Sequence, residues 1–252
     1  MKPKVAVIMC AKNSELFIQE AIESILNQTY SDFEFIIVEN CSTDKTWQII
    51  RSYSDSRIKA FRTELAQPSF NSNYGLLQTQ AEFIARIDSD DIAKPERLER
   101  QVRYLEAHPE ICVLGTAIEC FQDNKLSTII NLPLTNDEIR KKLPFIFSIC
   151  HPAVMFRRSV IVEKGGYAGG KCNLDFDLWL RLSRDKNVKF ANLSEPLLRY
   201  RIHASQIKGS RESYATSAGI LLREALLQKS PRLFIASVFA CLKIFRASKN
   251  LA

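Results

Sequence analysis

The chain has 252 residues, of which 46% are hydrophobic and 25% charged, with a formal net charge of +7 at pH 7. This balance is ordinary for a globular protein with one sizeable core, and no run approaches the roughly 18 apolar residues that a membrane-spanning helix needs. The seven cysteines form no C-x-x-C pair, which disfavours a zinc site or a disulfide framework and predicts reduced thiols in a cytoplasmic protein.

The positive charge is concentrated near the end of the sequence. Residues 201–252 contain nine Lys or Arg and two Glu, so this segment carries a net charge of +7 and the rest sums to about zero. A basic segment of this kind favours an acidic surface as its partner. No nucleic-acid partner is expected.

Strand-like and helix-like segments alternate through the first half of the chain. The predicted strands are 5–9, 33–39, 57–61 and 82–87. The predicted helices between and after them are one that Ser14 caps and that includes 18–26, then about 42–52, 72–81 and 95–108. This alternation indicates an α/β fold with a mostly parallel sheet and helices on both faces. Ligands of such sheets bind outside the carboxyl ends of the strands.

The second half of the chain is less regular. Its pattern predicts one or two strands over 111–121, helices over 136–143 and 172–185, a strand, turn and strand over 187–203, and helix from about 211 to the end. No internal repeat or clear linker is present. The simplest partition is a catalytic domain at 1–205 and a basic amphipathic helical tail at 206–252.

Polar residues follow the first two predicted strands, at the edge where a nucleotide could lie. Ala11, Lys12 and Asn13 follow the first strand, and Glu39 begins a polar stretch that continues to Asp44. Neither the glycine pattern of a dinucleotide site nor that of a P-loop is present. The second stretch is equally consistent with a capped turn that binds nothing, because Asn, Ser, Thr and Asp are the usual turn and cap residues.

Three carboxylates lie within four residues at the end of the fourth predicted strand: Asp88, Asp90 and Asp91. Adjacent carboxylates repel one another unless a counter-charge is present. Carboxylate oxygens suit hard cations, and Mg2+ commonly joins one or two carboxylates to substrate phosphates. The pattern therefore predicts a Mg2+ or Mn2+ site that holds a diphosphate. The alternative is an acidic turn ahead of the helix at Pro95.

A second acidic pair, Asp175 and Asp177, stands at the start of a predicted helix. Acids in a first turn interact favourably with the helix dipole, which is the ordinary explanation. Residues two apart do not share a helix face. We therefore expect at most one functional base here, with the other residue a surface acid.

Two further features are weaker signals. His203 ends a strand-like segment, and such a histidine is more often an ordinary surface or core residue than a ligand. Residues 163–170 hold four of the eight glycines, including Gly165 and Gly166. Their backbone could approach a ligand closely, or form a loose turn.

The predicted tail contains a ten-residue apolar run at 233–242, flanked by Arg232, Lys243 and Arg246. Three interpretations stay open. The run could pack on the rest of the protein, pair with a second copy of the chain, or lie on an anionic membrane surface.

Six segments of the sequence occur together in a known order and approximate spacing: "VAVIMCAKN", "FIIVENCSTDKT", "IARIDSDD", "HPAVMFRRSV" with "GGY", "DFDLWLRL" and "LLRYRIH". Each is weak alone, but six in order are specific. Over residues 3–205 the chain resembles the family 2 glycosyltransferases of GT-A fold, inverting enzymes of bacterial surface-polysaccharide synthesis. The resemblance implies a Rossmann-like, mostly parallel central sheet with helices on both faces.

The resemblance also implies donor contacts. Ala11, Lys12, Asn13 and Glu39 match the positions that contact the nucleotide base and ribose, and Asp88 matches the first acid of the Asp-x-Asp pair, which faces the nucleotide.

Roles in the chemistry are implied in the same way. Asp90 matches the acid that holds a divalent metal, Mn2+ or Mg2+, and His203 matches a histidine that can complete that site. Asp175 matches the general base. Gly165 and Gly166 match the glycine loop that borders donor and acceptor.

The chain departs from the family pattern at four positions: Cys10 replaces a usual Pro, Lys12 an aromatic residue, Cys41 a Gly and Leu174 a Glu. The change at Lys12 alters the surface near the nucleotide, so the base is not predicted. The change at Leu174 removes the usual acidic neighbour of the general base, which affects how the acceptor is handled.

The implied function is inverting transfer of a sugar from a nucleoside-diphosphate sugar to a hydroxyl of a glycan or lipid-linked acceptor. The setting would be lipopolysaccharide, O-antigen or capsule synthesis at the inner membrane face. One alternative is a catalytically inactive binding or scaffold protein with this fold. A sugar nucleotidyltransferase is less favoured, because "MCAKNS" lacks the Gly-rich basic loop of that class.

Overall fold

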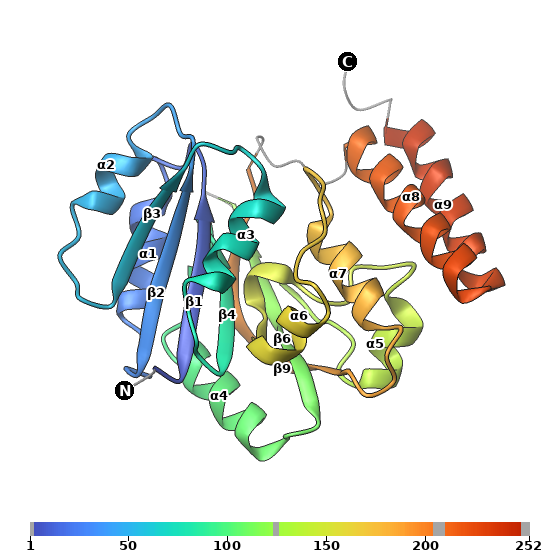
Figure 1. Cartoon of the computed structure of the whole chain (residues 1–252), viewed down its shortest axis with the longest axis horizontal. Helices are drawn as coiled ribbons and strands as arrows, with labels where there is room; N and C mark the ends of the chain where they lie inside the picture. The colour runs from blue at the N-terminus through green and yellow to red at the C-terminus, as the bar shows by residue number, and fades with distance from the viewer. Residues whose placement is uncertain (1–2, 123–125, 204–209, 248–252) are drawn as a thin grey trace.

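The computed structural model describes residues 3–122, 126–203 and 210–247, which form one mixed sheet covered by helices (Figure 1). The strands are β1 (Val5–Ala11), β2 (Phe33–Asn40), β3 (Ile58–Thr63), β4 (Phe83–Asp88), β5 (Ile92–Ala93), β6 (Ile111–Phe121), β7 (Thr128–Ile130), β8 (Met155–Arg157) and β9 (Lys189–Arg201). The helices are α1 (Ile18–Leu26), α2 (Thr46–Arg51), α3 (Pro68–Leu77), α4 (Arg97–Ala107), α5 (Asn136–Lys142), α6 (Arg158–Glu163), α7 (Leu174–Leu182), α8 (Arg211–Gln228) and α9 (Pro231–Ala247).

The first half of the sheet is parallel, as predicted. Strands β3, β2, β1 and β4 are neighbours in that order and run in the same direction. Their side chains alternate between two cores: Val5 and Val7 belong to the core that α1 and α4 cover, and Ala6 and Ile8 to the core that α3 and α7 cover. Because both of their faces are buried, β1, β2 and β4 are mostly apolar, whereas the edge strand β3 is partly exposed. The predicted α/β class is confirmed.

The second half of the sheet is mixed. Strand β8, a three-residue strand that the sequence did not predict, is antiparallel to both β4 and β6. The strand, turn and strand predicted over 187–203 is wrong, because β9 is one strand parallel to β6. Thr116 pairs with Leu193 and Ala117 with Pro196, so the two residues between form a bulge instead of a turn.

The described part of the tail is helical, as predicted, and forms a hairpin of two helices, α8 and α9. Lys229, with φ of 50°, ends α8 in the left-handed region, and Pro231 opens α9, where a proline needs no hydrogen-bond partner for its nitrogen. Leu221 of α8 lies in the same core as Leu178 of α7. Ser237 of α9 donates to a carbonyl of α8, and Figure 1 shows the two helices side by side.

The tail therefore packs on the rest of the protein, with α8 against α7. The partition at residue 205 stays a prediction, and positions 206–209 and 248–252 of the predicted tail lie outside the described residues. Over the described ranges, no helix is both long enough and apolar enough to cross a membrane.

Candidate active site

The carboxyl ends of three parallel strands bring the predicted site residues to one edge of the sheet. Cys10 pairs with Asp88 across β1 and β4, and Ala11 pairs with Glu39 across β1 and β2. Ala11 is buried, and the neighbouring Lys12 is exposed. The positions predicted to bind the nucleotide are thus neighbours in space, although they lie far apart in the sequence.

The loop after β1 is bonded to both neighbouring loops. Asn13 has φ of 48°, its backbone N–H donates to the Ser42 hydroxyl at 2.9 Å, and its side-chain oxygen accepts from the Thr43 N–H at 3.0 Å. The hydroxyls of Ser14 and Ser89 lie 2.6 Å apart. These bonds fix the polar edge before any ligand arrives.

The acidic cluster is compact. One carboxylate oxygen from each of Asp88, Asp90 and Asp91 lies within 4.8 Å of the others. The Nε2 atom of His203 lies 2.8 Å from Oδ2 of Asp90, so the predicted pair is brought together. Asp91 accepts from the backbone N–H of Arg201 at 2.9 Å, which ties the end of β9 to the cluster.

The acids disfavour each other's charged form. Removal from water and the charge of Asp90 raise the pKa of Asp88 to about 7; buried Arg86 opposes this, and the charge of Asp175 adds to it. Burial, Asp88 and Asp90 raise the pKa of Asp91 well above its ordinary value. A divalent cation would remove this repulsion.

The cluster fits Mn2+ or Mg2+. Its donors are carboxylate oxygens with one imidazole nearby, a set that suits a hard cation. Asp91 keeps one oxygen, Oδ2, that is buried without a hydrogen-bond partner among the described residues. An orphaned buried acceptor beside two further carboxylates is the feature that a cation would satisfy.

Glu39 is fully buried at the end of β2. One carboxylate oxygen accepts from the Ser42 N–H, and the other lies 2.8 Å from Nε of Arg62. Asp44 accepts from the Thr46 N–H at 3.0 Å at the start of α2. The segment is therefore a capped turn in this structure, and contact of Glu39 with a nucleotide stays a prediction.

The two acids of α7 have different environments. Asp175 is half-buried in the first turn, and its charge contributes to the raised pKa of Asp88. Asp177 is not the surface acid that the sequence suggested. It is 3% exposed and forms ion pairs with Arg181, at 2.7 Å, and with Arg223 of α8. Asp177 was misjudged because Arg223 lies 46 residues away in the sequence.

The start of α7 is held by α8. Asn173, with φ of 57°, precedes the helix and donates to the Ser213 carbonyl at 2.6 Å and the Ser217 hydroxyl at 2.8 Å. The Ser213 hydroxyl donates back at 3.0 Å. The backbone that carries Asp175 is thus positioned by the first helix of the tail.

The glycine loop has the backbone that its sequence requires. Gly165 and Gly166 have φ of 82° and 63°, and a Cβ on Gly166 would lie 2.4 Å from the side-chain oxygen of Asn73. Asn73 exchanges hydrogen bonds of 2.8 and 2.9 Å with the backbone of Tyr167. Arg181 of α7 donates to the Gly166 carbonyl. The loop is held between α3 and α7.

Sequence reasoning missed a buried polar group beneath the cluster. Arg86 of β4 is 2% exposed, with one guanidinium nitrogen 3.7 Å from the Cys10 sulfur and another 4.0 Å from Asp88. Near it, Nε2 of His151 lies 2.8 Å from the Tyr167 hydroxyl, and burial keeps the pKa of His151 well below its ordinary value. A charged residue inside the apolar "FIARI" was the available signal.

Several known proteins are similar to this chain in sequence. Residues 6–165 match the family described as Glycosyl transferase family 2. The O-antigen biosynthesis glycosyltransferase WbnJ of Escherichia coli is 37% identical over 240 residues, which cover 93% of this chain and 94% of that protein. The amylovoran biosynthesis glycosyltransferase AmsE of Erwinia amylovora is 34% identical over 143 residues, covering 55% of this chain and 52% of that protein.

Solved structures agree with the fold. S. aureus TarS in complex with UDP-GlcNAc superposes with a TM-score of 0.68 at 20% identity, over 88% of this chain and 67% of that one. The mannosyltransferase PcManGT from Pyrobaculum calidifontis, in complex with GDP-Man and Mn2+, gives 0.64 at 16% identity, over 98% and 74%. At these identities the likeness shows the GT-A fold alone. The sequence matches show more: the chain belongs to glycosyltransferase family 2 and is a glycosyltransferase that uses a nucleotide-sugar donor.

Proposed function

We propose that the protein transfers a sugar from a nucleoside-diphosphate sugar to an acceptor hydroxyl with inversion at the anomeric carbon. The observation that carries this proposal is the compact cluster of Asp88, Asp90 and Asp91 at the carboxyl ends of the strands, in a chain that belongs to a glycosyltransferase family. Asp175 of α7 would be the base. A base on one side and a diphosphate-binding cluster on the other are the parts that a single displacement needs.

In this mechanism Asp175 takes the proton of the acceptor hydroxyl. The acceptor oxygen attacks the anomeric carbon from the face opposite the diphosphate. The bond from that carbon to the diphosphate oxygen breaks, and its electron pair leaves with the nucleoside diphosphate. One displacement of this kind inverts the anomeric centre.

The chain's own residues bind and orient the donor. We assign the base and ribose to the edge formed by Ala11, Lys12, Asn13 and Glu39, and the ribose-diphosphate side to Asp88. The bonds that hold this edge in place would reduce the ordering cost of binding.

The rest of the donor pocket comes from the metal ligands and the glycine loop. Asp90 and His203 would hold Mn2+ or Mg2+, which stabilises the negative charge that develops on the leaving diphosphate. Gly165 and Gly166 lack side chains where the loop would border the sugar and the acceptor.

The acceptor is proposed to be a hydroxyl of a growing surface glycan, such as an O-antigen unit carried on a lipid. The support is that WbnJ and AmsE, which this chain resembles, have names that place them in O-antigen and amylovoran biosynthesis. The protein would then act at the cytoplasmic face of the membrane.

The test is a thermal-shift panel with UDP, GDP, dTDP and CMP, each with and without Mn2+. The variants are Asp90→Asn and, as a matched control, Asp32→Asn, whose side chain is exposed ahead of β2 at the amino-terminal edge of the sheet. We expect one nucleoside diphosphate to stabilise wild type and Asp32→Asn only with Mn2+, and Asp90→Asn not at all.

A transfer assay follows with the sugar donor that the panel selects. Inversion is read from the anomeric configuration of the product by NMR. A product with retained configuration would refute the single displacement. A protein that binds no nucleotide and hydrolyses no donor would be an inactive member of the family, and the proposal would fail.

A further inference from the structure

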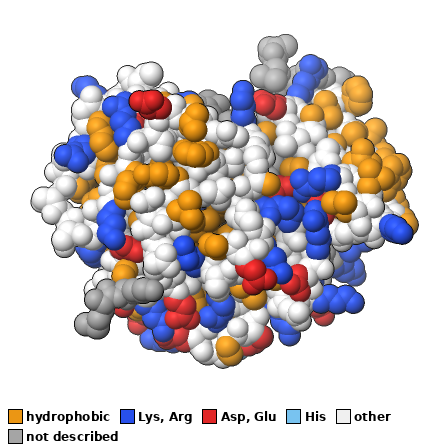
Figure 2. Space-filling view, viewed as in Figure 1, with side chains coloured by type: hydrophobic (Ala, Val, Ile, Leu, Met, Phe, Trp, Pro, Cys, Tyr) orange, Lys and Arg blue, Asp and Glu red, His pale blue; other side chains and the backbone are white. Residues whose placement is uncertain are grey.

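The outward face of α9 is apolar. Six of its side chains are between 46% and 74% exposed: Phe234, Ile235, Val238, Phe239, Leu242 and Phe245. Spacings of one, three and four residues place them on one side of the helix. The opposite side, with Leu233, Ala236 and Ala240, is buried. Figure 2 shows the resulting cluster of hydrophobic side chains over α8 and α9. Apolar patches of this kind usually mark an interaction surface.

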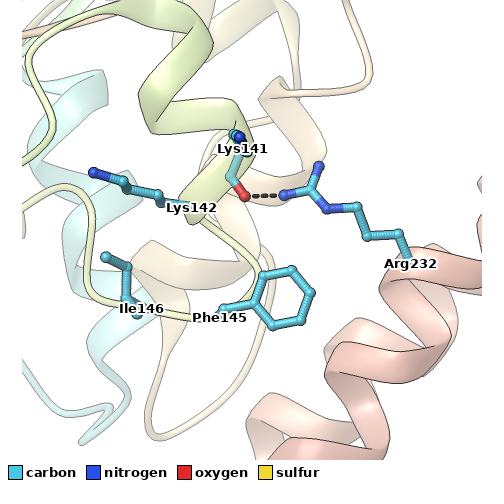
Figure 3. A pocket seen from close by; sticks show the side chains of 5 residues that line it. All are labelled: Lys141, Lys142, Phe145, Ile146 and Arg232. Atoms are coloured by element: carbon cyan, nitrogen blue, oxygen red, sulfur yellow. Dashed lines mark hydrogen bonds between the residues drawn. The ribbon is translucent and has the colours of Figure 1, made fainter.

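The apolar face continues into a hollow beside α5. Arg232, at the start of α9, donates to the Lys141 carbonyl, and its guanidinium lies 5.5 Å from the centre of the Phe145 ring. Figure 3 shows these residues with Lys142 and Ile146, which complete the lining. The hollow has a volume of about 430 Å³ and lies away from the acidic cluster.

The charges that line the hollow have one sign. The charged residues that line the hollow are Lys141, Lys142 and Arg232, and exposed Lys243 stands further along α9. The sequence has no Asp or Glu after Glu224. A partner that covers the apolar side chains and these cations would have to offer apolar groups and anions together.

We propose that the outward face of α9 and the hollow beside α5, together called the α9 surface, bind an anionic lipid bilayer. The aromatic and aliphatic side chains would enter the boundary between headgroups and acyl chains, and the cations would contact headgroup phosphates. A second copy of the chain fits less well, because two such surfaces would bring like charges together. The binding of a bilayer does not depend on the proposed transfer reaction, whereas its consequence for the acceptor rests on that proposal.

This docking would place the bilayer next to the acceptor side of the site. Helix α9 packs on α8, and α8 holds the start of α7 through Asn173 and the ion pair of Asp177 with Arg223. A lipid-linked acceptor would therefore approach the helix that carries Asp175. The same contacts make truncation of the tail a poor test, because it would disturb the site as well.

The experiment is co-sedimentation of the full chain with phosphatidylcholine vesicles, with or without phosphatidylglycerol, at low and high salt. Leu242→Ser is compared with Leu126→Ser, because both leucines are exposed and Leu126 lies between β6 and β7. Arg232→Gln is compared with Arg103→Gln, an exposed arginine of α4. Thermal unfolding of each variant shows that it is folded.

We expect wild type to bind vesicles that contain phosphatidylglycerol, and added salt to weaken binding. Leu242→Ser should weaken it about tenfold and Arg232→Gln about fivefold, while both controls bind as wild type does. The proposal is overturned if wild type binds neither vesicle, binds both equally, or if each variant equals its control. A dimer in light scattering that Leu242→Ser dissociates, without vesicle binding, would assign the surface to a second copy instead.

Discussion

The contact between α7 and α8 depends on one buried carboxylate, Glu224. It is 0% exposed and accepts from Arg184 at 2.7 Å, Arg223 at 2.8 Å and Gln228 at 3.0 Å. Arg223 also reaches Asp177 on α7. Glu224→Gln keeps the size of the side chain and removes the charge that the two arginines share. We expect this change to lower stability and loosen the helix that carries the proposed base.

The size of the effect follows from the pKa of Glu224. Burial alone would raise this pKa, but hydrogen bonds from Arg184, Arg223 and Gln228 outweigh burial and lower it from 4.5 to about 2. That shift corresponds to about 3 kcal/mol of unfolding free energy at neutral pH. The arginine side chains are 39% and 42% exposed, so solvent screening reduces the expected loss to about 2 kcal/mol. For a chain of this length, that loss lowers Tm by about 4–8 °C.

The effect has a defined pH dependence. A carboxyl whose pKa is lowered on folding stabilises the protein above its unfolded pKa, and this contribution is lost as pH falls toward the folded value. The difference in Tm between wild type and Glu224→Gln should therefore be constant above about pH 5 and shrink between 4.5 and about 2.

Thermal unfolding by circular dichroism across this pH range measures the difference. The matched control is Glu212→Gln, an exposed acid in the first turn of the same helix. We expect that control to change Tm by less than about 2 °C, because exposed charges near a helix end contribute little. Equal Tm values for the two variants at neutral pH, or a difference that does not shrink in acid, would refute the reasoning.

Three further predictions concern the site. Asp175→Asn should lower kcat about 10²- to 10⁴-fold while the nucleotide-induced thermal shift is kept; loss of both would mean that the residue binds the donor instead. His203→Gln should raise the Mn2+ concentration needed for half-maximal activity about 10- to 100-fold, and the same change at His108, a partly exposed residue beyond α4, should not. Gly166→Ala should unfold at a lower temperature than Gly165→Ala, because both have positive φ but only Gly166 lacks room for a Cβ; equal values would contradict this.

The parts of the fold that the sequence predicts are those with strong local patterns. Strands β1, β2 and β4 are mostly apolar and buried on both faces, so their positions were predicted to within a few residues. Strand β8 was missed because three residues are too few to show the alternation of side chains that is typical of a strand. The bulge in β9 was taken for a turn. Two extra residues of β9 have no partner on β6, and the pairing of the two strands cannot be read from the sequence of β9 alone.

The residues of the site also differ in whether a local sequence pattern predicts their place. The acidic cluster follows a strand end directly, so its compactness could be expected from the sequence. The contact of His203 with Asp90 was expected only from the family resemblance, because 113 residues separate them. The burial of Asp177 depends on a partner from the tail and had no local signal. The end of α8 did have a local signal, because Ser230 caps the next helix, α9, and Pro231 is its first residue.

Strand β9 returns the late part of the chain to the acidic cluster. It pairs with β5, its last residue donates to Asp91, and His203 just beyond it contacts Asp90. This return limits how chimeras with related enzymes can be built. A crossover between β4 and β9 would join Asp91 from one parent to an end of β9 from another. Exchanges of acceptor specificity should therefore replace an internal segment that ends before β9, so that the acidic cluster and the end of β9 stay from one parent.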